Sequence, residues 1–87
     1  MESKLEKQYK PYMNIGPGAF IKEELDTNGL TDRDLIKRFN NSEQLALDIL
    51  NDRKPINSEI ADLLGEMFGQ SATYWLNLNN LYQNYKQ

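Results

Sequence analysis

The chain has 87 residues, ten of them basic and thirteen acidic, so its net charge is -3. This balance is the reverse of the basic surface expected of a protein that binds nucleic acid mainly through phosphates, and it predicts weak non-specific DNA binding. The absence of cysteine and histidine excludes disulfides, thiolate chemistry, the commonest zinc ligands and histidine-based catalysis.

The N-terminal residues predict neither a signal peptide nor a membrane span. Residues 1–7 are rich in charge, no apolar block follows them, and apolar runs elsewhere are only a few residues long. We therefore expect a cytoplasmic protein. Residues 1–16 mix charge, tyrosine and glycine without a settled period, which predicts a flexible N-terminal arm before a single domain at 17–87.

Two helices are predicted in the first half of that domain. The first begins near Pro17 and ends at Gly29, because proline suits a first helical turn and glycine a helix end. The second begins with a capping box of Thr31 and Asp34. It ends at Asn40–Asn41, a pair that tolerates the left-handed backbone of a tight turn. Their apolar faces are Phe20, Ile21 and Leu25 in the first helix and Leu35, Ile36 and Phe39 in the second.

A third helix is predicted to begin at Ser42, which can cap its first turn. Apolar residues recur at helical spacing and predict an inward stripe of Ala46, Ile49 and Leu50, with Leu45 at its margin. The opposite, outward face consists of Glu43, Gln44, Leu47, Asp48 and Asn51.

Two further helices complete an all-α fold of five helices, because no alternating pattern typical of strands competes. Asn57 or Ser58 caps the fourth helix, which ends at Gly69, and Ser71 caps the fifth. Their apolar residues are Ile60, Ala61, Leu64 and Phe68 in the fourth helix and Tyr74, Trp75, Leu76, Leu78, Leu81, Tyr82 and Tyr85 in the fifth.

The second and third predicted helices, joined by a tight turn, form a helix-turn-helix as a physical unit. The motifs around them are Pro17-Gly18 before Ile21-Lys22-Glu23-Glu24-Leu25, then Gly29-Leu30-Thr31 with Asp34-Leu35, the string Ile49-Leu50-Asn51-Asp52-Arg53-Lys54-Pro55-Ile56, Phe68-Gly69 with Ser71, and Tyr74-Trp75-Leu76-Asn77-Leu78. With these motifs, residues 16–82, about three quarters of the chain, resemble the HigA-type antitoxins of the Xre or lambda-repressor-like family.

The resemblance implies a five-helix lambda-repressor-like helix-turn-helix domain whose third helix binds operator DNA. It also implies a homodimer that represses its own operon and neutralises a HigB-type ribonuclease toxin. The chain departs from the family pattern at Ala19, where the family often has an acidic residue, and at Asn40–Asn41, where it has a glycine turn. The family's outward recognition positions are usually Ser, Thr, Arg or Gln, whereas here they are Glu43, Gln44, Leu47 and Asp48.

Several residues are candidates for contacts to DNA. Gln44 and Asn51 can recognise adenine, and Leu47 can touch a thymine methyl. Ser42 is placed beside them at the start of the helix. Contacts to the phosphates of the DNA backbone would come from Lys37, Arg38, Arg53 and Lys54. Alternatively, these charges form an ordinary solvated face, Asn51 helps to end its helix and Leu47 is partly buried.

The same face supports a second function. Residues 31–54 carry equal numbers of cations and anions, and an acidic side chain in the major groove meets the negative potential of the phosphates. A helix-turn-helix scaffold that no longer recognises DNA could bind a basic protein through Glu43, Leu47 and Asp48. The family resemblance favours DNA binding, and the chemistry of the face favours the protein-binding module.

The last helix carries more apolar surface than a chain of this length can bury. We expect Trp75 and Leu78 to pack in the core, and Leu81, Tyr82 and Tyr85 to form a symmetric dimer contact.

Catalysis is not expected, and neither is a metal or another cofactor. Carboxylates need burial or a shared pocket to act as a catalytic acid and base, and those that occur here at helical spacing fall on the polar faces of their helices. These carboxylates are Glu23, Glu24, Asp26, Glu59, Asp62 and Glu66.

Overall fold

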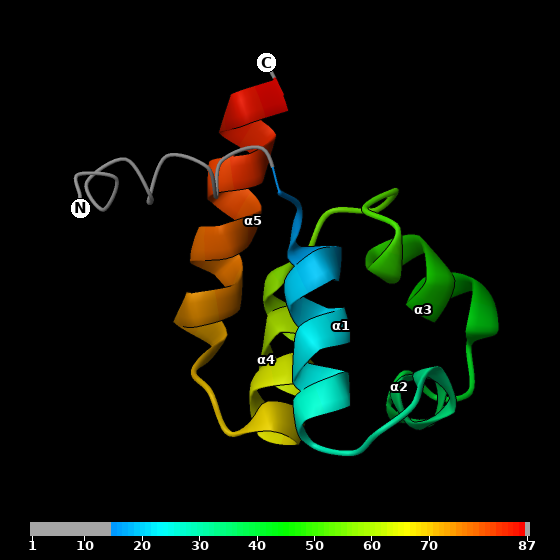
Figure 1. Ribbon diagram of the computed structural model, residues 1–87. Coiled ribbons are helices and arrows are strands. Elements are labelled where there is room, and N and C mark those ends of the chain that lie inside the picture. Colours follow the sequence, from blue (N-terminus) through cyan, green and yellow to red (C-terminus); the bar gives the residue numbers. More distant parts are fainter. Residues whose placement is uncertain (1–14, 87) are drawn as a thin grey trace.

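A computed structural model describes residues 15–86 of the chain. In that range the backbone forms five helices and no strand, so the predicted all-α class is confirmed (Figure 1). The helices are α1 (Pro17–Thr27), α2 (Asp32–Arg38), α3 (Glu43–Leu50), α4 (Ser58–Phe68) and α5 (Ala72–Lys86). The predicted N-terminal arm lies almost entirely outside the described residues.

The first two helices end and begin as the sequence predicts. Pro17 stands in the first turn of α1, and Gly29 follows the helix with a left-handed φ of 69°. The carboxylate of Asp34 accepts hydrogen bonds from the backbone N–H of Thr31 at 2.7 Å and from its hydroxyl at 3.1 Å. These bonds satisfy a donor that would otherwise be unpaired at the start of α2, which confirms the capping box.

The turn between α2 and α3 is made by two asparagines in the left-handed conformation. Asn40 has φ 57° and Asn41 has φ 62°, so both residues occupy the region predicted for them. Ser42 then caps α3, because its hydroxyl oxygen accepts a hydrogen bond from the Leu45 N–H at 3.3 Å. The chain therefore makes a tight turn between α2 and α3 without a glycine.

The ends of α4 and α5 follow the same logic. Of the two predicted caps for α4, Asn57 fills the role, with its Oδ1 atom 2.8 Å from the Ile60 nitrogen. Gly69 ends α4 in the left-handed conformation with φ 75°. The hydroxyl of Ser71 accepts from the Tyr74 N–H at 3.2 Å and starts α5.

The core lies where α1 packs between the other helices. The helix α1 contacts α3 on one side and α5 on the other. In addition, α4 packs against α5, and α2 packs against α3 (Figure 1). Trp75 is fully buried, and Leu78 is half-buried against the core, as predicted. The buried apolar side chains are Ile21, Leu25, Leu35, Phe39, Ala46, Ile49, Leu50, Ile56, Ile60, Ala61, Leu64 and Trp75.

One buried residue of α5 differs from the predicted apolar stripe. Asn79 is only 7% exposed, and its Oδ1 accepts a hydrogen bond from the backbone N–H of Ile56 at 2.9 Å. The loop between α3 and α4 thus gains an acceptor that no apolar side chain could supply. Nearby on the same helix, Leu81 and Tyr85 remain exposed.

None of the helices in the described range is both long and apolar enough to cross a lipid bilayer.

Candidate functional site

The helix α3 presents one face to the core and the other to solvent. Its inward residues are the predicted Ala46, Ile49 and Leu50, all of them buried. The helix sits close against α1, because a Cβ atom placed on Gly18 would collide with the carbonyl of Leu50. Glycine at this position therefore sets the distance between α1 and the end of α3.

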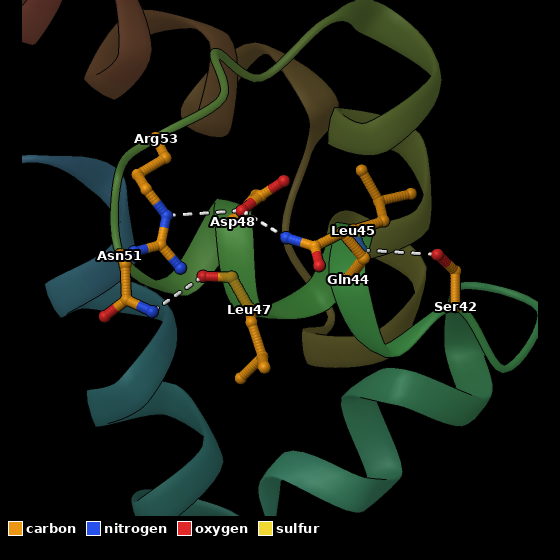
Figure 2. Close-up of polar contacts among 7 residues, drawn as sticks. All are labelled: Ser42, Gln44, Leu45, Leu47, Asp48, Asn51 and Arg53. Atoms are coloured by element: carbon orange, nitrogen blue, oxygen red, sulfur yellow. Dashed lines mark hydrogen bonds and ion pairs between the residues drawn. The ribbon is translucent and has the colours of Figure 1, made fainter.

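A small polar cluster covers the middle of the outward face (Figure 2). The Oδ1 atom of Asp48 accepts a hydrogen bond from Gln44 Nε2 at 2.9 Å. The same oxygen accepts from Arg53 Nε at 3.2 Å, so the acidic side chain is held between an amide and a guanidinium. Two predicted DNA contacts are therefore joined by a residue that was predicted to face a protein.

The remaining outward residues lie on either side of this cluster. Glu43 is exposed at the first turn, and Leu47 is half-buried. Asn51 follows α3 as its C-cap, and its side-chain amide donates to the backbone carbonyl of Leu47 at 2.9 Å (Figure 2). The Asn51 amide thus takes part in ending the helix, which was one of its two predicted roles.

The loop after α3 is anchored by a carboxylate to which the sequence analysis assigned no role of its own. Asp52 has a left-handed φ of 59°, and its Oδ1 accepts from the Gly18 N–H at 2.8 Å. It thereby caps the start of α1, whose own N-cap residue is Gly16 and has no side chain. The sequence feature that could have indicated this contact is Gly16, because a glycine N-cap has no side chain to accept a hydrogen bond from the first turn of α1.

The four cations predicted to contact DNA phosphates have different surroundings. Arg38 forms an ion pair with Glu66 of α4 at 2.5 Å, and Arg53 forms the pair with Asp48. Lys37 and Lys54 are exposed, and neither forms an ion pair with any residue in the range 15–86. Among these four cations, the two lysines are therefore the ones left free to meet phosphates.

A cavity of about 160 Å³ lies between the end of α2, the start of α3 and the start of α4. This is smaller than the ~300 Å³ at which small-molecule sites begin. The cavity suits one inserted side chain or a few waters. Its lining residues are Phe39, Asn40, Leu45, Lys54, Asn57, Glu59, Ile60 and Leu63.

The predicted dimer residues lie on the outer side of α5. Leu81 is 40% exposed and Tyr85 is 53% exposed, which are large values for apolar and aromatic side chains. Tyr82 is half-buried, with the ammonium of Lys86 5.2 Å from the centre of its ring. The apolar surface at this end of α5 is therefore open for contact.

Comparisons with protein-family models, with curated proteins and with solved structures gave no match to the chain.

Proposed function

We propose that this protein is a HigA-like transcriptional repressor and antitoxin, with a lambda-repressor-like helix-turn-helix formed by α2 and α3. The observation that carries the proposal is the unit of two short helices around the Asn40–Asn41 turn. Its second helix is capped by Ser42, buries one side and leaves the other exposed. A helix presented in this way has the form required to enter a major groove.

Contacts to DNA would divide between the outward face and its edges. Gln44 lies in the first half of α3, the part of a recognition helix that contacts base edges, and Ser42 lies just before it. Lys37 and Lys54 stand at the two edges as contacts to phosphates, and their exposure leaves them available for that role. The polar cluster around Asp48 offsets its negative charge locally, which lowers the cost of bringing α3 close to phosphates.

The antitoxin part of the proposal rests on the family resemblance and on charge. A net charge of -3 is complementary to a basic ribonuclease. Exposed Leu81 and Tyr85 support a homodimer through α5, which would place two copies of α3 on a twofold operator.

A mobility-shift titration tests DNA binding directly. The purified protein is titrated against the duplex upstream of its own gene and against a scrambled duplex, at low and physiological salt. We expect a selective shift that weakens with salt and is lost in an Arg53→Ala, Lys54→Ala double variant. The matched control is Lys22→Glu, which changes the net charge by the same two units on α1 and should retain the shift. Equal loss in both variants would show that only total charge matters.

A protein-binding module is the second candidate. It is favoured by the ion pairs of Arg38 and Arg53, which leave less positive charge free near α3, and by the exposed carboxylate of Glu43. Absence of any shift at low salt, from a folded dimer, would select this function. The protein encoded beside this gene would then bind the wild type, and binding would fall in Glu43→Gln or Leu47→Ala variants.

A further inference from the structure

We infer that Arg53 recognises a guanine base in the major groove and that Asp48 is the residue that positions it. The inference rests on the proposed DNA-binding function and gives it a base preference. It also changes the role of Arg53 from a contact with a phosphate, which carries no sequence information, to one that specifies a base.

The position of the guanidinium is the first step. Arg53 belongs to the loop after α3, yet its Nε atom bonds to Asp48, which lies within the helix. The side chain therefore turns back along the outward face instead of extending past the helix end (Figure 2). A group in that position enters a groove together with α3.

The chemistry of the remaining edge is the second step. With Nε bonded to Asp48, the two Nη groups form the free end of the guanidinium. They have no hydrogen-bonding partner among residues 15–86, and the side chain is 61% exposed. Two parallel N–H donors match the O6 and N7 acceptors of guanine, which is the commonest specific contact between proteins and DNA.

The restraint on Asp48 is the third step. Its Oδ1 atom is held by Gln44 as well as by Arg53, and its side chain is only 26% exposed. An exposed ion pair of this kind adds little to stability. Its effect is to restrict the rotamers of Arg53 before DNA arrives, so that less side-chain entropy is lost when the base is bound.

The neighbouring Lys54 provides an internal comparison. It is exposed and forms no ion pair within the described range, so nothing there holds its ammonium along α3, and the ammonium lacks the rigid, planar pair of donors that the guanidinium has. We therefore assign Lys54 to a phosphate and Arg53 to a base.

The test begins with selection of duplexes from a random pool by the wild-type protein. Binding is then measured by fluorescence anisotropy on the best duplex and on versions in which each guanine is replaced by 7-deazaguanine, which lacks only the N7 acceptor. We expect one replacement to weaken wild-type binding by roughly 5-fold to 100-fold. The variant Arg53→Ala should bind both duplexes alike, and its loss of affinity for scrambled DNA should equal that of Lys54→Ala, which removes the same charge.

Two further variants separate positioning from charge. Asp48→Ala should lose the preference for guanine although removal of a carboxylate strengthens binding to scrambled DNA. Lys54→Ala should weaken binding to every duplex equally and keep the preference. Circular dichroism confirms that each variant is folded.

The remaining outcomes are distinct. If the wild type binds selected DNA and no deaza replacement matters, or if Arg53→Ala keeps the preference, the inference is wrong and the proposed repressor stands. Retention of the preference in Asp48→Ala overturns the positioning role of Asp48. If the wild type binds no duplex, the proposed function fails and the inference fails with it.

Discussion

Asp34 is the carboxylate whose ionisation is most clearly tied to the folded state. Hydrogen bonds from the Thr31 N–H and then from the Thr31 hydroxyl, helped by the nearby charge of Lys37, lower its pKa below the ordinary value of 3.8. A carboxyl whose pKa is lowered on folding stabilises the fold fully above its ordinary pKa. That contribution is lost as the pH falls through the lowered value.

We expect Asp34→Asn to lower the free energy of unfolding at neutral pH, and we expect the difference from wild type to shrink as the pH falls below 3.8. Urea titrations across this pH range measure it. Asp32→Asn is the matched control, because Asp32 shares the first turn of α2 and makes no capping bond among residues 15–86. An equal loss in both variants would assign the effect to the helix dipole instead of to the capping bond.

Asn41 adopts the left-handed conformation in the turn between α2 and α3, and substitutions can test how much this conformation costs. With φ at 62°, Asn41→Ala should be less stable than Asn41→Gly by about 1 to 2 kcal/mol, because alanine has the Cβ atom that disfavours this region and glycine does not. Asn41→Gly should be close to neutral or stabilising, since glycine adopts the conformation without strain. Chemical denaturation measures both, and similar stability of the two variants would contradict the explanation.

At the scale of elements, the sequence was sufficient where the partner lies nearby in the chain. Thr31 with Asp34, Ser42 with Leu45, and Ser71 with Tyr74 are each three residues apart, so the start of a helix can be predicted from a short window. The same holds for the inward and outward faces of α3, which follow from helical periodicity.

The missed contacts are those between distant residues. Asp52 lies 34 residues from Gly18, and Asn79 lies 23 residues from Ile56. Helical spacing places Asn79 on the same face as Trp75, but no local pattern identifies its partner, because that depends on how α5 packs against the α3–α4 loop. For the same reason the sequence could predict that Arg38 and Arg53 lie near α3, but it could not predict which carboxylate each would meet.

Asn79 should therefore matter more than its polar side chain suggests. In Asn79→Ala the buried N–H of Ile56 loses its acceptor, and we expect a loss of about 1 to 3 kcal/mol. Asn80→Ala, on the exposed side of the same helix, is the control and should change stability by less than ~0.5 kcal/mol. Thermal and urea unfolding measure the stability of both variants. Equal stabilities would mean that water replaces the lost bond.

At the scale of the whole molecule, the end of α5 presents Leu81 and Tyr85, which the described residues of a single copy leave exposed. We expect Leu81→Asp to shift a dimer toward monomer, because it places a charge in an apolar contact. Asn80→Asp adds the same charge one residue away and should leave the dimer intact. Sedimentation velocity over a range of concentrations measures both. A wild type that is monomeric at all concentrations, or a dimer that tolerates Leu81→Asp, would remove α5 from the interface.

The chain contains a single tryptophan, Trp75, which is fully buried beside Phe68 and Tyr74 and whose indole N–H has no hydrogen-bonding partner in the described range. An indole in such dry surroundings emits at short wavelength, and its emission moves to longer wavelength when water reaches it. Trp75 belongs to α5, which α1 separates from α3, the helix proposed to contact DNA (Figure 1). The emission wavelength of Trp75 therefore reports unfolding of the domain, and we expect it to stay unchanged when a ligand covers α3.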